Sequence, residues 1–191
     1  MTRLTREAVV AEALELLDEV GLDQVSTHTL ARRLGIKQPS LYSHFRNKDE
    51  LLAAMAEAAM APHARFPLPS PSDDWREWFM ANTDSFRQTL LLRRDGARLH
   101  AGSRPVGAGL ERTRLKIDFL VGAGLPQHPA EMAMLAASRF TVGSVLEQQA
   151  EQQALLTGAQ PHGTQIDHDE AFRCGVSLII DGLGLMATEC G

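Results

Sequence analysis

The stretch from Ser26 to Lys48 has the pattern of two short helices joined by a tight turn. Ser26 or Thr27 can cap a first helix and Gly35 can end it, because small hydroxyl residues favour helix starts and glycine favours helix ends. A second short helix begins around Pro39, which the first turn tolerates because an N–H there has no helical partner anyway. The stretch therefore predicts a helix-turn-helix, a motif that can place its second helix in the major groove of DNA.

The charge of the same region favours contact with DNA. Residues 24–48 contain five basic residues and no Asp or Glu, whereas the whole chain has a net charge of −5. Phosphate contact needs such a local positive field and does not need a basic protein overall. The alternative interpretation is a helical hairpin whose Lys and Arg side chains are simply solvated.

The composition favours an all-α protein. The chain has 191 residues, of which 44% are hydrophobic and only 5% aromatic, and the abundant Ala and Leu favour helices. No apolar run approaches the roughly 18 residues that span a bilayer, and the two cysteines provide no disulfide framework. The sequence thus predicts a cytoplasmic protein with no membrane partner.

Periodicity divides the chain into a head, a linking helix and a body. Residues 1–48 are expected to form a three-helix head with the helix-turn-helix, residues 49–66 the linking helix, and residues 67–191 a helical ligand-binding and dimerisation body. Three prolines between residues 66 and 72 mark the junction, since proline disfavours helix interiors. In the body we expect helices near residues 72–92, 94–100, 107–122, 129–155 and from 167 onward.

The two long C-terminal helices predict an apolar face that a second subunit covers. Two-fold symmetry would also place two recognition helices about 34 Å apart, as a palindromic operator requires. Cys174 falls in the apolar pattern of the last helix and is expected in the core. Gly96 is expected to make the helix near residues 94–100 conformationally soft. The apolar side of helix 129–155 is expected to carry Met132, Leu135, Ala136, Phe140 and Leu146.

The order of helix, helix-turn-helix, linking helix and larger all-α body resembles the TetR family of bacterial repressors. The match is dense near Leu4 to Met55, LTREAVVAEALELLDEVGLDQVSTHTLARRLGIKQPSLYSHFRNKDELLAAM. Two later blocks, FRQTLLLRRDGARLHAGSRP and RFTVGSVLEQQ, look like the tetracycline-responsive subgroup. The resemblance implies a homodimer that binds a double-stranded DNA operator and is released by a small-molecule inducer.

The resemblance also implies a set of DNA-contacting residues in and beside the helix-turn-helix. They are Thr27, His28, Gln38, Pro39, Ser40, Tyr42, Ser43, His44 and Lys48. Gln38 can read adenine through two hydrogen bonds, and the ring of Pro39 can meet a thymine methyl group. His28 stands where the tetracycline repressors can place a base-reading Arg, and Ser43 is small, so the operator sequence stays open. Tyr42 has an alternative role in packing between helices.

In the same subgroup the body holds a drug–magnesium chelate. The candidate ligand-binding positions, two cationic departures included, are His63, Asn82, Phe86, His100, Ser103, Arg104, Lys116, Arg139 and Glu147. The resemblance implies that His100 and Glu147 lie at Mg²⁺, that Asn82 bonds the ligand and that Phe86 stacks on it. The ordinary alternatives are a helix cap for His100, surface ion pairs for Arg139 and Glu147, and core packing for Phe86.

Three departures from the subgroup bear on the inducer. Ala64 stands where the tetracycline repressors have a second histidine, Lys116 where they have Gln, and Arg139 where they have His. Two added cations favour an acidic ligand or disfavour a magnesium-bound one. The sequence leaves open a tetracycline-like inducer and a different, anionic polycyclic compound.

Two other functions compete with this interpretation. A small helical hydrolase is disfavoured, because the chain has no Gly-x-Ser-x-Gly, phosphate loop or His-Glu-x-x-His motif. His100 near Ser103 also lacks a third member of a catalytic triad. A divalent-metal-responsive DNA-binding regulator would use His100, Glu147 and His63. Release of DNA by a metal alone, without an organic ligand, would favour that alternative.

Overall fold

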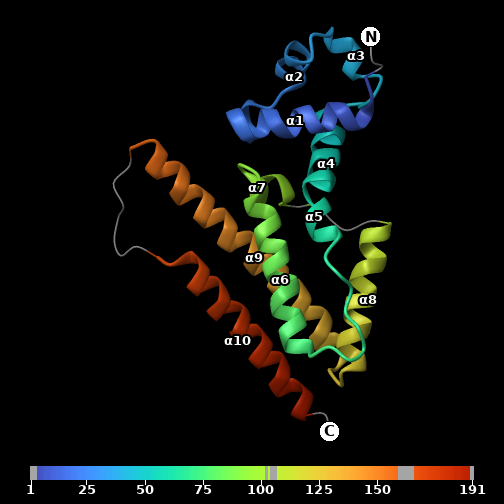
Figure 1. The fold of residues 1–191 in the computed structure, drawn as a ribbon, viewed down its shortest axis with the longest axis vertical. Helices are drawn as coiled ribbons and strands as arrows, with labels where there is room; N and C mark the ends of the chain where they lie inside the picture. The colour runs from blue at the N-terminus through green and yellow to red at the C-terminus, as the bar shows by residue number, and fades with distance from the viewer. Residues whose placement is uncertain (1–3, 102, 104–106, 159–165, 190–191) are drawn as a thin grey trace.

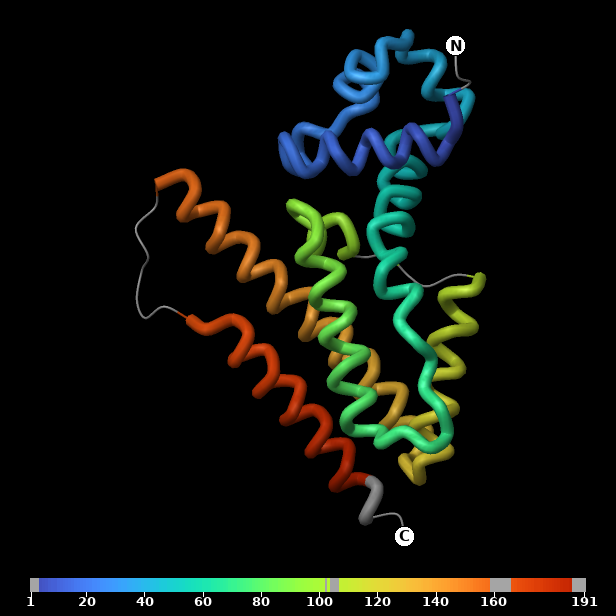
Figure 2. The backbone as a smooth tube through the Cα atoms, in the orientation of Figure 1, coloured from blue at the N-terminus to red at the C-terminus, as the bar shows by residue number. Residues whose placement is uncertain are grey.

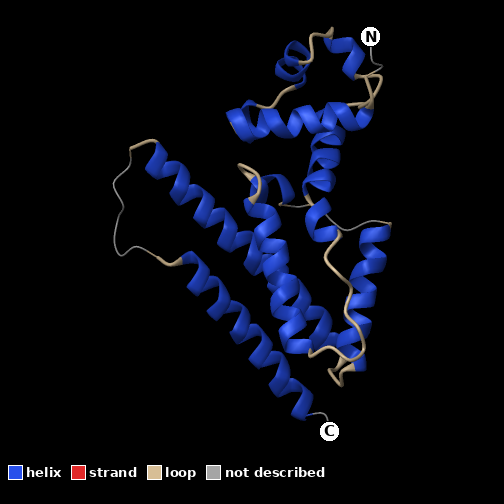
Figure 3. Cartoon of the chain, in the orientation of Figure 1, coloured by secondary structure: helices blue, strands red, loops and turns tan. Residues whose placement is uncertain are grey.

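The computed structural model describes residues 4–101, 103, 107–158 and 166–189, and every regular element in those ranges is helical (Figure 3). The prediction of an all-α fold with a helix-turn-helix head is confirmed. No helix in the described ranges has the length and apolar character needed to cross a membrane. In chain order the elements are α1 (Arg6–Val20), the 3-10 turn η1 (Leu22–Gln24), α2 (Thr27–Arg33), α3 (Gln38–Leu41), α4 (Lys48–Ala59), α5 (Ala61–Ala64), α6 (Trp75–Leu91), α7 (Gly96–His100), α8 (Ala108–Gly122), α9 (Gln127–Leu156) and α10 (His168–Glu189).

Local side-chain caps set the helix starts of the head. The Thr5 hydroxyl accepts the N–H of Ala8 at the start of α1. Ser26 and Thr29 form a reciprocal capping box at the start of α2. Each cap satisfies backbone N–H groups that the helix itself leaves unbonded. The expected cap of α2 at Ser26 is confirmed.

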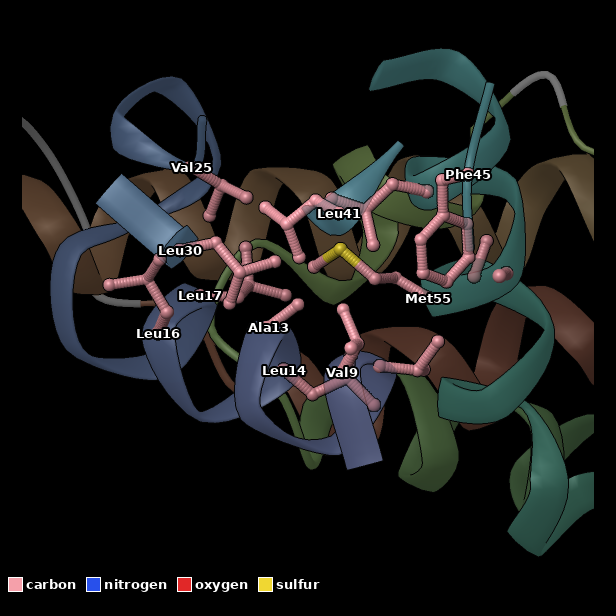
Figure 4. Packing of buried hydrophobic residues seen from close by; sticks show 14 of the residues in the cluster. Val9, Ala13, Leu14, Leu16, Leu17, Val25, Leu30, Leu41, Phe45 and Met55 are labelled. Atoms are coloured by element: carbon pink, nitrogen blue, oxygen red, sulfur yellow. The ribbon is translucent and has the colours of Figure 1, made fainter. Parts of the chain in front are cut away.

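The head has a hydrophobic core in which α1, α2, α3 and α4 meet (Figure 4), and Leu99 of α7 belongs to the same cluster. Leu30, Leu41 and Met55 are almost fully buried there, so apolar packing against α1 and α4 holds α2 and α3 in place. Gly35 has a φ of 65° between α2 and α3, a backbone conformation that favours glycine. The tight turn and the shared core fix α3 relative to α2.

The body packs α6, α8, α9 and α10 around a second core, with α9 and α10 running antiparallel (Figure 2). The buried face of α9 consists of small residues: Ala130, Ala133, Ala137, Thr141 and Val145. Of the bulky apolar residues predicted on one side of α9, Phe140 packs against the core and stacks on Phe172, whereas Met132, Leu135 and Leu146 are exposed. Small side chains let α9 approach its neighbours closely.

A buried arginine joins three helices of the body. Arg87 on α6 is only 2% exposed, and its guanidinium donates to Gln148 of α9 at 2.8 Å. It also pairs with Asp169 of α10 at 2.7 Å and lies over the ring of Phe172. Because a buried charge is costly unless it is paired, these contacts fix the three helices relative to one another.

Polar contacts attach the head to the body beside α7 (Figure 1). Asp95 precedes α7 and accepts the backbone N–H of Leu22 in the head at 2.8 Å. Arg98 of α7 pairs with Asp23 at 2.8 Å, and Asp18 of α1 binds Arg93. The head is therefore held at its base by α7 as well as by α4.

Gly96 has a packing role that the sequence did not predict. A Cβ atom at this position would lie 2.0 Å from the carbonyl oxygen of Leu90. The chain therefore needs glycine here so that α7 can lie against the end of α6. Gln149 of α9 holds the same turn, because its side chain donates to the carbonyl of Arg93 at 2.8 Å.

Replacing Gly96 with Ala should lower the free energy of unfolding by about 1–3 kcal/mol, the usual cost of overpacking a tight site. Urea unfolding measures the change. Gly122→Ala is the matched control, because a Cβ there meets no atom within 4 Å. The control should be neutral or slightly stabilising. Equal effects of the two substitutions would contradict the packing role of Gly96.

Candidate DNA interface and ligand site

The outer surface of the helix-turn-helix presents most of the predicted DNA-contacting side chains. Tyr42 is 50% exposed, and its position at the end of α3 leaves the ring free of the head core. This exposure disfavours packing between helices as its role. The predicted residues that are exposed are His28, Pro39, Ser40, Tyr42, Ser43 and Lys48, and those that are partly buried are Thr27, Gln38 and His44.

Two hydrogen bonds order this surface. Gln38 donates from its side-chain amide to the Thr27 hydroxyl at 2.9 Å, which ties the first turn of α3 to the first turn of α2. Ser43 donates to the carbonyl of Ser40 at 2.7 Å. The amide nitrogen of Gln38 has a second N–H group, so the side chain can keep its bond to Thr27 and still present a donor and an acceptor to adenine.

One of the five basic residues of this region is paired with carboxylates of α1. Arg33 pairs with Glu12, Glu15 and Glu19 on α1. Those carboxylates neutralise its charge, so Arg33 braces α2 against α1. The exposed basic side chains that remain for phosphates are Arg32, Lys37, Arg46 and Lys48.

In the body, three predicted ligand-site residues form a cluster of rings. Phe86 of α6 is buried, and its ring centroid lies 5.4 Å from that of His63 of α5 and 5.1 Å from that of His100 of α7. His63 also stacks on Phe66, with the ring centroids 6.3 Å apart. His63 therefore contacts two phenylalanine rings, as a planar aromatic ligand could.

Lys116 joins this cluster from α8. Its ammonium group lies 3.4 Å from Nε2 of His63, and only 7% of the residue is exposed. Nδ1 of His63 is 3.1 Å from the Ser85 hydroxyl. If Lys116 donates to Nε2, the proton of the neutral ring is on Nδ1 and bonds to Ser85.

Burial and neighbouring cations lower the pKa of His63, His100 and Lys116, so that at pH 7 the two histidines are neutral whereas Lys116 keeps its proton. Burial, followed by the charges of Lys116, Arg112 and His100, lowers the pKa of His63 to about 3. Burial and the charge of Arg112 lower the pKa of Lys116 to about 8. Burial also lowers the pKa of His100. The site is short of negative charge.

Asn82 and Ser103 complete the part of the predicted site that the structure brings together. Asn82 precedes Phe86 by one turn of α6, is 5% exposed, and its Oδ1 has no hydrogen-bond partner among the described residues. The Ser103 hydroxyl is hydrogen bonded to Nδ1 of His100 at 3.1 Å. A buried carbonyl oxygen without a partner is costly, so Asn82 has an acceptor to offer to a ligand.

The remaining predicted residues are not part of this cluster. Arg139 and Glu147 lie exposed on α9 and form no hydrogen bond or ion pair with the described residues. Arg104 lies outside the described residues. The described residues contain no group of three His, Cys, Asp or Glu side chains that could hold a metal. The expectation of a buried Cys174 is wrong, because α10 leaves that face exposed.

Sequence reasoning missed three members of the cluster. Arg112 lies one turn before Lys116 on α8 and donates to the carbonyl of Phe66. Ser85 holds His63 in place. The spacing of four between Arg112 and Lys116 was the available signal, since such residues share a helix face. Nothing in the sequence pattern links Ser85 or Phe66 to His63.

The neutral His63 predicts a pH-dependent stability. Its folded pKa of about 3 lies below the ordinary value of 6.5. Below pH 6.5 the unfolded chain binds a proton that the folded chain does not, so stability falls as the pH falls from about 6.5 towards 3. Between pH 7 and pH 5 the wild type should lose about 2 kcal/mol more free energy of unfolding than the His63→Gln variant, as urea titrations would measure. Identical losses would contradict a neutral His63.

Two family profiles match the chain. One is described as bacterial regulatory proteins of the tetR family and matches residues 9–55. The other is described as the tetracyclin repressor-like C-terminal domain and matches residues 66–162. Together they cover most of the helix-turn-helix head and of the body, and within the ring cluster they include Phe66, Phe86 and His100 but not His63.

Named relatives agree with these matches. The tetracycline repressor class C of Escherichia coli is 42% identical, over 97% of this chain and 93% of the relative. A TetR-family transcriptional regulator from Streptomyces coelicolor is 60% identical, over 95% of this chain and 96% of that one, with a TM-score of 0.75. TetR class A, solved with 5a,6-anhydrotetracycline and magnesium, is 41% identical over 96% of this chain and 99% of that one, with a TM-score of 0.81. The chain belongs to the TetR family of bacterial regulatory proteins.

Proposed function

We propose that the chain is a homodimeric transcriptional repressor that binds a palindromic DNA operator and releases it when a small-molecule inducer binds the body. Residues 1–48 are the DNA-binding head, 49–66 the link and 67–191 the body. The proposal depends on one observation: the same chain has an exposed α3 surface in the head and a cluster of aromatic rings in the body. A regulator needs both parts, and the named relatives are regulators and not enzymes.

The DNA interface follows from the exposed surface of α3. Pro39 and Tyr42 stand on the outer side, with basic side chains around them. Phosphate contacts position such a helix and base contacts specify its site. Tyr42 and Lys48 suit the first task, and Gln38 and Pro39 the second.

Apolar side chains on α10 support the homodimer. Leu178 is 74% exposed and Met186 is 50% exposed. Together with the exposed bulky residues of α9, they form a face that a second copy would bury by two-fold symmetry. The same symmetry would pair the two heads for a palindromic operator.

The ring cluster supports an aromatic inducer, either tetracycline-like or another anionic polycyclic compound. A magnesium chelate of the kind solved with TetR class A fits these residues poorly. Within one chain His100 is the one magnesium donor proposed in the cluster, while Glu147 is exposed on α9. Lys116 adds a cation nearby. A second copy of the chain would have to supply Glu147. The alternative of a regulator that responds to a metal ion alone lacks support, because the described residues contain no group of three side chains that could hold a metal.

The position of α7 supports coupling between inducer and DNA. His100 at its end touches Phe86 of the ring cluster, while Asp95 and Arg98 at its start bind the head. An open hollow of about 290 Å³ lies beside the contact between α7 and α4 and is lined by residues of both helices, among them Leu52 and Arg98. An inducer that displaces His100 would therefore move the base of the head. Ligand and DNA would then favour different states.

Replacing Tyr42 with Ala should weaken DNA binding about tenfold or more, because a hydroxyl bond to a phosphate is lost. Fluorescence anisotropy would measure the affinity for DNA selected from a random pool by the wild-type protein. The oligomeric state should not change, because Tyr42 caps α3 and α3 lies at the far end of the molecule from the contact between α9 and α10 (Figure 1).

Leu110→Ala is the matched control, because Leu110 is 59% exposed but lies on α8 in the body. It should bind the selected DNA like the wild type. Unchanged affinity of the Tyr42 variant would remove this residue from the interface. Failure to select any DNA would contradict the proposed function itself.

A further inference from the structure

His63 occupies a position that resembles a bound aromatic ligand. Its planar ring contacts both Phe66 and Phe86, with centroid distances of 6.3 and 5.4 Å. Its Nε2 accepts from Lys116 at 3.4 Å. The side chain comes from α5, a helix of four residues joined to the body through its own loop. The contacts of His63 thus define a template: a flat ring with an acceptor that faces Lys116.

Lys116 is poorly satisfied by this arrangement. Only 7% of Lys116 is exposed, and no described Asp or Glu lies within ion-pair distance of its ammonium group. The other charged or titratable groups that face it are His63 from α5, Arg112 from its own helix and, behind His63, His100 from α7. A buried ammonium group that bonds to a neutral imidazole keeps much of its desolvation cost.

We propose that His63 is an internal occupant of the inducer site, and that the inducer is a planar aromatic acid whose anionic oxygen replaces Nε2 of His63 on Lys116 without a metal ion. The inference rests on the proposed function, since it names the ligand class of that site. An anionic oxygen is a stronger partner for Lys116 than a neutral ring nitrogen. The aromatic part takes the stacking place on Phe86.

Two further groups, the Asn82 amide and the Arg112 guanidinium, restrict the chemical class of the ligand. The free Oδ1 of Asn82, one turn from Phe86, needs a hydrogen-bond donor. A hydroxyl group on the aromatic framework would provide it. Arg112 adds positive charge beside Lys116. The site therefore selects a hydroxylated aromatic acid over a neutral compound or a metal-bound cation.

The matched probes are 2-naphthoate and the uncharged 2-naphthamide, which have the same shape and differ in charge. Binding to the full-length dimer is measured by isothermal titration calorimetry, with EDTA and with magnesium. The wild type should bind 2-naphthoate about tenfold or more tightly than the amide, because a charge-assisted bond is lost. EDTA should change neither affinity.

The His63→Ala variant separates an occupant from a contact residue. If His63 competes with the ligand, its removal should tighten 2-naphthoate binding several-fold, whereas loss of a contact would weaken it. Lys116→Gln should abolish the preference for the acid. Arg114→Gln, a change on an exposed cation of the same helix, should keep it. Thermal unfolding of each variant checks that the body is intact, and His63→Ser replaces His63→Ala if the latter does not fold.

Four results would overturn the proposal: equal affinity for the two probes, no binding of either, weaker or unchanged binding by the His63 variant, or a preference that survives in Lys116→Gln. Binding that requires magnesium would also overturn it. DNA binding by the same preparation tests the proposed function separately. A protein that binds selected DNA but fails the naphthoate test would retain the first proposal and lose the second.

Discussion

The contact between Lys116 and His63 is the constraint on which the functional site depends. An ammonium group buried without a carboxylate costs free energy, and the neutral imidazole at 3.4 Å offsets only part of that cost. The same contact places His63 against Phe86, and Phe86 in turn against His100. One unfavourable burial therefore sets the position of three rings from three different helices and leaves the site ready for an anion.

Because His100 belongs to α7, one short helix connects the ring cluster to the head. Asp95, just before α7, holds Leu22, and Arg98 holds Asp23. Gly96 lets this helix approach α6 closely. The ion pairs to the head are mostly exposed, so each is weak, and the buried Leu99 of α7 adds an apolar contact to the head core. The junction is the part of the fold that a ligand can most easily rearrange.

Much of the fold could be predicted because its signals are local. Caps such as Ser26 act within three residues, and helical periodicity is visible in the sequence. The site was predicted only in part. Resemblance pointed to Phe86 and His100, but the bond between His63 and Lys116 joins residues 53 positions apart and depends on tertiary packing. The exposed Cys174 was mispredicted because periodicity alone cannot tell a face covered by this chain from one left for another subunit.

The most direct test of a metal-free, cationic inducer site is a tetracycline fluorescence titration of the purified protein, with magnesium and with EDTA. The account predicts no tight, magnesium-dependent binding, because Lys116 is buried in the ring cluster and Glu147 is exposed on α9. Tight binding that EDTA abolishes would contradict it. That result would show that His100 and Glu147 form a chelate site across two copies of the chain.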